Sequence, residues 1–147
     1  MYTIDTSVWV NATEPREIDH ADSRGFLRAS AARSLPIVVP TLVLVEVAAT
    51  VGRMRGEQRS LRVTRLLAHW RAITFHDLDR ALADAAADLA RVYRLRGADA
   101  VYAAVARHYG TTLVSRDREH LTRLVGIVNV LHPAAALAAL TAAPPPT

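Results

Sequence analysis

Residues 98–117, ADAVYAAVARHYGTTLVSRD, contain the helix, turn and strand that decide the fold. The apolar run at 100–106 predicts a helix, Gly110 stops it, and the β-branched run TTLVS that comes next is typical of a buried strand. A crossover helix lies antiparallel to the parallel strand it leads into, so it begins at the edge of the sheet where that strand ends. Asp99, near the start of the helix, and Asp117, after the strand, are therefore expected at the same carboxyl edge.

Short β-rich runs alternate with longer helical stretches along the rest of the chain. Strands are expected at 2–4, 34–40, 73–75, 111–115 and 127–131, and helices at 20–34, 41–55, 57–70, 78–95, 98–109 and 117–125. Gly56 and Gly97 are expected to stop helices, and Asp77 or Asp79 to cap the helix that starts near 78. Strands this short, separated by helices, favour crossover connections. We therefore predict a three-layer α/β/α sandwich with a short, mostly parallel central sheet.

The length and the composition limit the classes of protein to be considered. The chain has 147 residues, of which 51% are apolar, so it fits one domain with a hydrophobic core. We expect this domain over 1–135, followed by a short C-terminal tail at 136–147. The tail is expected to finish a short helix and then to continue as a proline-rich end.

The charge and the cysteine content limit the classes of binding partner and active site that this chain can have. All 18 basic residues are arginine, and with 14 acidic residues the net charge is +4. This balance suits a polyanionic partner such as nucleic acid, although codon bias accounts for the same composition equally well. Because lysine is missing there is no P-loop, and the patterns GxGxxG, HExxH and GxSxG are missing too. The lack of cysteine excludes disulfides, thiolate ligands and a cysteine nucleophile.

The expected compartment is the cytoplasm. No apolar run approaches the roughly 20 residues that span a bilayer. The first ten residues, MYTIDTSVWV, carry no basic region of the kind that begins a signal peptide.

Two acidic residues in the first third of the chain are candidates for a site. Asp5 follows the first expected strand directly, although it is also placed to cap a helical turn over 8–10. Glu46 lies in TLVLVEVAATV, where its helical neighbours at three and four residues are Leu42, Val43, Ala49 and Thr50. A carboxylate on such an apolar face needs a cation, because burying an uncompensated charge costs several kcal/mol. A metal ion meets that need; an arginine partner or a narrow solvated stripe remain alternatives.

Asp99 and Asp117 each have an ordinary explanation as residues that stabilise helix N-termini. Four acids at one edge of a sheet, however, favour a shared purpose, because crowded carboxylates repel each other unless a cation neutralises them. Oxygen ligands without cysteine or a histidine cage favour Mg²⁺ or Mn²⁺ over zinc. Such a site hydrolyses phosphodiesters with metal-activated water, and we expect products with a 5′-phosphate and a 3′-hydroxyl.

The ordered set of acidic motifs resembles the PIN-domain nucleases, and specifically the VapC-type toxins of bacterial toxin–antitoxin pairs. The segments that resemble the four family motifs are Asp5-Thr6-Ser7-Val8-Trp9-Val10, the helix that carries Glu46, Arg96-Gly97-Ala98-Asp99-Ala100 and Leu113-Val114-Ser115-Arg116-Asp117. The resemblance extends from residue 2 to about residue 131. It implies a Mg²⁺-dependent endoribonuclease that forms homodimers and is inhibited by a small cognate antitoxin.

The resemblance also implies roles for individual residues. Asp5, Glu46, Asp99 and Asp117 are expected to be catalytic metal ligands, and Thr6 and Ser115 to support them by orienting a ligand or water. The family often shows a further acidic or aromatic residue after its fourth acid. Here Glu119 either assists from just outside the site or lies on an exposed helix face.

Other interpretations stay open at this point. A PIN-type nuclease acting in RNA maturation or on DNA without an antitoxin is one alternative, and a non-catalytic basic nucleic-acid-binding module with the acids as caps is another. Trp9 and Trp70 are expected to pack in the core or in a dimer interface, and the six histidines show no ligand spacing. A basic run either holds RNA phosphates, meets an acidic antitoxin surface or is a solvated face; it consists of Arg53, Arg55, Arg59, Arg62 and Arg65.

Overall fold

The computed structural model describes residues 1–142 and contains within them a five-stranded sheet of order β3-β2-β1-β4-β5. Each neighbouring pair of strands is parallel, as expected. The strands are β1 (Tyr2–Ile4), β2 (Ile37–Pro40), β3 (Ile73–His76), β4 (Thr112–Val114) and β5 (Val130–Leu131).

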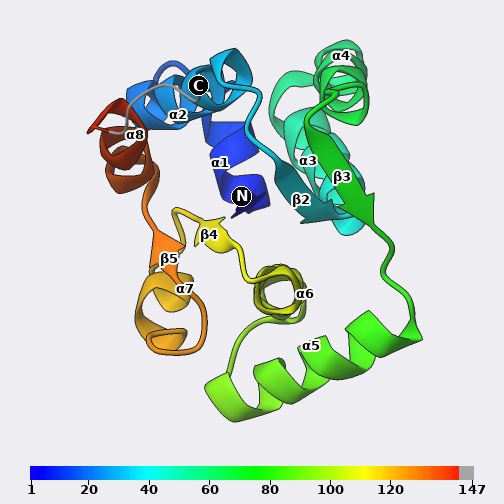
Figure 1. The fold of residues 1–147 in the computed structure, drawn as a ribbon. Coiled ribbons are helices and arrows are strands. Elements are labelled where there is room, and N and C mark those ends of the chain that lie inside the picture. Colours follow the sequence, from blue (N-terminus) through cyan, green and yellow to red (C-terminus); the bar gives the residue numbers. More distant parts are fainter. Residues whose placement is uncertain (143–147) are drawn as a thin grey trace.

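Helices cover both faces of this sheet (Figure 1). One side carries α5 (Arg80–Tyr93), α6 (Gly97–Tyr109) and α7 (Arg118–Arg123). The other side carries α1 (Thr6–Asn11), α2 (His20–Ala32), α3 (Leu42–Arg55), α4 (Glu57–Ala68) and α8 (Pro133–Ala142). The predicted three-layer α/β/α sandwich is confirmed. None of the helices within residues 1–142 is long and apolar enough to cross a membrane.

Helix α6 lies close to the sheet because its inner face is built from small residues. Ala100, Ala103 and Ala104 are buried there, and the helix contacts β1, β2 and β4. The strands present fully buried side chains such as Ile4 and Leu113, each of which contributes about 1.5–3 kcal/mol on burial. This packing fixes the first turn of α6 near the carboxyl ends of β1 and β4.

The structure corrects the sequence-based prediction at three places. Helix α1 is absent from the predicted helices and was anticipated only as an alternative helical turn over 8–10. It forms because Val8, Trp9 and Val10 are buried, and tertiary packing stabilises so short a helix. Gly97 does not stop a helix but begins α6; α5 ends instead at Arg94, which adopts the left-handed conformation with φ 55°. The last strand covers only two of the five residues expected to form it.

The chain returns to the core after β5. Helix α8 packs on α2 and buries Ala136 and Leu140, so the expected C-terminal helix is present. The approach is close: a Cβ atom at Gly25 of α2 would lie 2.8 Å from Cδ2 of Leu137. The proline-rich end expected beyond this helix, at 143–147, lies outside the described residues.

Glu14 fastens the loop between α1 and α2 to the end of α3. Its side chain is almost completely buried, and both carboxylate oxygens accept hydrogen bonds from Nε of Arg55, at 3.1 and 2.9 Å. A further bond comes from Nη2 of Arg55. These hydrogen bonds are the main reason that the pKa of Glu14 lies below its ordinary value, against the opposing effect of burial.

Candidate active site

Asp5 follows β1 directly and is almost fully buried. Its Oδ2 atom accepts hydrogen bonds from Oγ of Ser7 at 2.7 Å and from Oγ of Ser115 at 2.8 Å. Although Asp5 occupies the N-cap position of α1, its side chain makes no capping hydrogen bond. The carboxylate is therefore held by two hydroxyl groups, one from the first turn of α1 and one from the residue after β4, and not by a capping bond to the backbone of α1.

Glu46 points from α3 toward two hydroxyl groups. Its Oε2 atom accepts from Oγ1 of Thr6 at 2.8 Å and from the phenol of Tyr102 at 2.7 Å, and these hydroxyl oxygens lie 2.6 Å apart. Burial, and then the negative charge of Glu46, raises the pKa of Tyr102, so the phenol keeps its proton and donates it. Tyr102 was not predicted from the sequence, although its position three residues after Asp99 places both on one face of α6.

Asp99 is the third residue of α6, and Arg96 occupies the N-cap position. Its Oδ2 atom is buried and has no hydrogen-bond partner among residues 1–142. Burial is the main cause that raises the pKa of Asp99; the charge of His120 opposes it, and the charges of Asp5 and Asp117 add to it. Asp99 therefore lies within electrostatic reach of two other predicted acids.

Asp117 does cap a helix, as its alternative interpretation proposed. Oδ1 accepts from the backbone N–H of Glu119 at 2.7 Å, and the N–H of Asp117 donates to Oγ of Ser115 at 3.0 Å. The Glu119 side chain turns to Arg123, with an ion pair of 3.2 Å along α7. This pairing favours the exposed helix face over a role at the site for Glu119.

His120 is a second residue at the site that the sequence analysis missed. The imidazole is fully buried, and its Nε2 atom donates to the backbone carbonyl oxygen of Asp99 at 3.0 Å. Its Nδ1 atom lies 2.9 Å from Oγ of Ser115. The ring nitrogens also lie 3.9 Å from Oδ2 of Asp5 and 4.0 Å from Oδ1 of Asp99. The histidine thus stands between two predicted metal ligands.

The four predicted acids share one property: each leaves at least one carboxylate oxygen without a hydrogen-bond partner within residues 1–142. In this part of the chain no three Asp, Glu or His side chains already stand close enough to share one metal ion. Mg²⁺, however, takes only one or two carboxylates and keeps several waters. The buried free oxygen of Asp99 and the hard oxygen donors around it fit such an ion.

The comparison with known families agrees with this arrangement. The model of the PIN domain matches residues 2–126. The chain belongs to the PIN domain family. The match covers all four predicted acids and the whole sheet apart from β5.

Solved structures with a similar fold include VapC and FitB toxins. The Mycobacterium tuberculosis VapC20, a sarcin–ricin loop cleaving toxin, has a TM-score of 0.71 and 18% identity over 88% of this chain and 98% of its own. A toxin–antitoxin complex from Klebsiella pneumoniae has a TM-score of 0.65 and 18% identity over 90% of this chain and 98% of its own. PAE2754 from Pyrobaculum aerophilum has a TM-score of 0.68 and 20% identity over 97% of this chain and 90% of its own. Among curated proteins, no sequence matches this chain.

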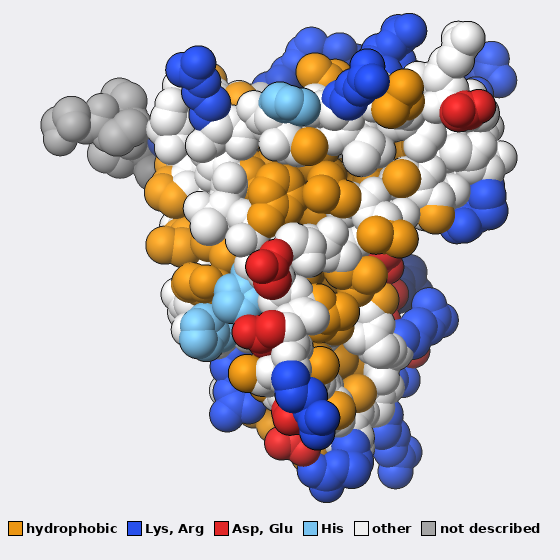
Figure 2. Space-filling model, turned by 90° about the vertical axis from the view of Figure 1, so that its right-hand side faces the viewer, with side chains coloured by type: hydrophobic (Ala, Val, Ile, Leu, Met, Phe, Trp, Pro, Cys, Tyr) orange, Lys and Arg blue, Asp and Glu red, His pale blue; other side chains and the backbone are white. Residues whose placement is uncertain are grey.

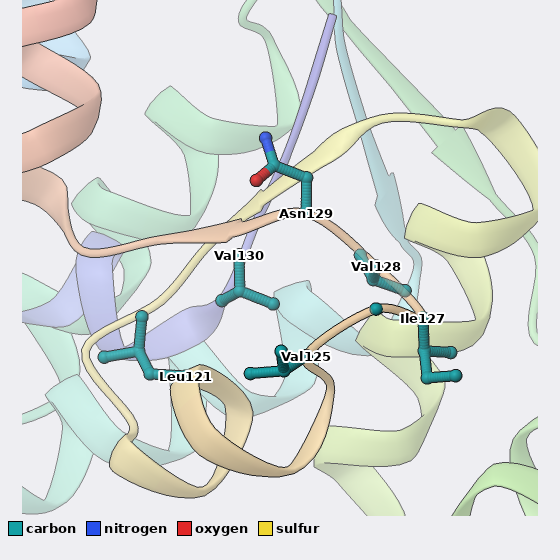
Figure 3. Close-up of a pocket in the computed structure, with 7 residues that line it drawn as sticks. Leu121, Val125, Ile127, Val128, Asn129 and Val130 are labelled. Atoms are coloured by element: carbon teal, nitrogen blue, oxygen red, sulfur yellow. The ribbon is translucent and has the colours of Figure 1, made fainter.

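One hollow of this PIN domain has none of the four predicted acids in its lining. It has a volume of about 520 Å³ and lies between α7 and β5, where Leu121, Val125 and Val130 line it (Figure 3). Its lining contains no acid, base or nucleophile. This hollow therefore offers no group for acid–base or metal chemistry, unlike the carboxyl edge of the sheet.

Proposed function

We propose that this PIN domain is a Mg²⁺- or Mn²⁺-dependent endoribonuclease and the toxin of a type II toxin–antitoxin pair. Asp5, Glu46, Asp99 and Asp117 are the residues that we assign to catalysis, as ligands of one or two divalent ions or as immediate supporters of those ligands. The observation that carries the proposal is the buried, unpartnered Oδ2 of Asp99 beside the charges of Asp5 and Asp117. A charge in that position needs a cation to compensate it.

The cap interpretation, on which a non-catalytic binding module depends, accounts for only part of the cluster. Asp117 caps α7, but Asp5 makes no capping bond and Asp99 follows the N-cap residue Arg96 by three positions. Asp5 is almost fully buried, and Oδ2 of Asp99 is buried as well. A shared metal site accounts for all four acids, whereas stabilisation of a helix N-terminus accounts for Asp117 and Asp99 and leaves Asp5 and Glu46 without an explanation.

The residues around the acids hold them for this chemistry. When bound, a divalent ion supplies an activated water and neutralises charge on the phosphodiester. Thr6 and Tyr102 orient Glu46, and Ser115 orients Asp5, each through one carboxylate oxygen. Arg96 is exposed and close enough to influence Asp99 electrostatically, so its guanidinium is available to bind a neighbouring RNA phosphate.

The proposed partner is a cognate antitoxin, and the proposed assembly is a homodimer that this antitoxin inhibits. Structural neighbours were crystallised as toxin–antitoxin complexes, including that of Klebsiella pneumoniae. On α4, the exposed Arg59, Arg62 and Arg65 alternate with exposed Leu61 and Leu66, which suits a partner with acidic and apolar side chains. Figure 2 shows arginines gathered at the top of one face of the molecule, above a band of apolar side chains.

The proposal is tested with purified full-length protein and a mixed RNA substrate. We expect cleavage to stop with a chelator and to return with Mg²⁺ or Mn²⁺, with Zn²⁺ a poor substitute. Products should carry 5′-phosphate and 3′-hydroxyl ends. RNA that is bound equally well in chelator and is never cleaved would instead identify a binding module.

A further inference from the structure

A chain of hydrogen bonds connects three separate elements of the site through one buried side chain. Oγ of Ser115 donates to Asp5 at 2.8 Å and accepts from the N–H of Asp117 at 3.0 Å. The same oxygen lies 2.9 Å from Nδ1 of His120, whose Nε2 donates to the carbonyl oxygen of Asp99 at 3.0 Å. One imidazole therefore links the end of β1, the loop after β4 and the first turn of α6.

The proton positions in this chain follow from the groups involved. A carbonyl oxygen only accepts, so Nε2 of His120 carries a proton. The single proton of Ser115 is donated to Asp5, and its lone pairs receive the N–H of Asp117. The 2.9 Å contact of Nδ1 with the same oxygen completes the network. These bonds reach Asp5 through Oδ2 and reach Asp99 and Asp117 through backbone atoms, so they leave Oδ1 of Asp5 and both carboxylate oxygens of Asp99 without a hydrogen bond.

We infer that His120 is a positioning residue of the proposed metal site, which sets Asp99 and Asp5 at a fixed separation so that both can bind one divalent ion. This inference rests on the proposed function and assigns it one further residue. His120 touches neither the metal nor the RNA in this assignment; it acts through Asp99 and Ser115. Outer groups of this kind orient the ligands of a metal and commonly change its affinity by about 10- to 100-fold.

A purely structural role for His120 is the competing explanation, because a fully buried ring also fills space beneath α7. Leu124, at the end of α7, is buried to the same extent but makes no polar contact with the acids. Leu124→Ala is thus a matched control for loss of packing. His120→Leu keeps an apolar filling and removes both hydrogen bonds. His120→Asn and His120→Gln are designed to keep only the bond to Ser115 and only the bond to Asp99, respectively.

The test measures Mn²⁺ alone, titrated into each full-length variant and followed by electron paramagnetic resonance, with the melting temperature recorded beside it. We expect His120→Leu to weaken Mn²⁺ binding by about 10- to 100-fold. His120→Asn and His120→Gln should lose less Mn²⁺ affinity, because each keeps one of the two hydrogen bonds. Leu124→Ala should lower the melting temperature and leave the Mn²⁺ affinity within about threefold of wild type.

Two results overturn the inference. One is a His120→Leu protein, or the Asn and Gln proteins if the first does not fold, that binds Mn²⁺ like the wild type. The other is a Leu124→Ala protein that loses as much Mn²⁺ affinity as His120→Leu. Failure of the wild type to bind Mn²⁺ at all would instead reject the proposed function itself, and the inference with it.

Discussion

Asp99→Asn removes one charge from the site without changing the side-chain volume, and we expect it to stabilise the metal-free protein. The pKa of Asp99 is raised chiefly by burial, while the charge of His120 opposes this and the charges of Asp5 and Asp117 add to it. A carboxyl group with a raised pKa favours the folded state while it is protonated. That contribution is present below the unfolded pKa of about 3.9 and is lost as the pH rises through the folded value.

The asparagine stays neutral at every pH, so the variant keeps the stabilisation that the wild type loses when Asp99 becomes charged. At pH 7.5 and without metal we expect a gain of about 1 kcal/mol in the free energy of unfolding. For 147 residues this corresponds to a rise of about 3 °C in the melting temperature. The difference should shrink toward pH 4, where Asp99 becomes protonated in the wild type.

Adding metal should make the wild type more stable than Asp99→Asn, the reverse of the order expected without metal. Mg²⁺ at ten times its dissociation constant stabilises the wild type by about 1.4 kcal/mol through mass action, and the variant should show little of this gain. A thermal-shift titration at pH 7.5, with chelator and with Mg²⁺, measures both effects. The reasoning is refuted if Asp99→Asn lowers the metal-free melting temperature as the loss of a helix cap would, and if Mg²⁺ stabilises both proteins equally.

Three further substitutions test separate parts of the structure. Arg55→Gln should lower the melting temperature at pH 7, because Glu14 loses the partner that lowers its pKa. A lowered pKa stabilises the folded state above the unfolded pKa of about 4.3, and this stabilisation is lost as the pH falls through the folded pKa. The melting temperatures of the variant and the wild type should therefore converge near pH 3. Tyr102→Phe should keep the fold but reduce kcat/KM on RNA by about tenfold, since Glu46 loses a hydrogen bond that orients it. Glu119→Gln should change kcat/KM by about threefold or less, because Glu119 pairs with Arg123; a loss as large as that of Asp99→Asn would place it in the site.

Local patterns were sufficient to predict most of the framework. The apolar helix from Ala100 and the strand after Gly110 follow from side-chain periodicity and from a glycine that adopts a positive φ of 62°. The carboxyl-edge rule then placed Asp5, Asp99 and Asp117 in one neighbourhood, and their mutual electrostatic effect on Asp99 agrees with that placement.

Features that depend on tertiary packing were not predictable in this way. Helix α1 is too short to be stable alone and exists because Trp9 packs against Trp70, with ring centroids 5.5 Å apart. His120 follows an acid by three residues on a polar helix, and nothing in the local sequence shows that its ring is fully buried. Tyr102 lies in an apolar stretch of sequence, and its hydroxyl donates a hydrogen bond to Glu46, 56 residues away in the chain.

The most direct test of the central claim is cleavage of one defined RNA by wild-type protein, Asp5→Asn and Asp99→Asn, in Mg²⁺ and at matched folded concentration. The account predicts that both substitutions reduce kcat/KM on the order of 100-fold or more, since even outer groups at metal sites cost 10- to 100-fold. It also predicts that neither variant loses its fold. Cleavage by correctly folded Asp99→Asn at the wild-type rate would contradict the assignment of this edge of the sheet as the metal-dependent active site.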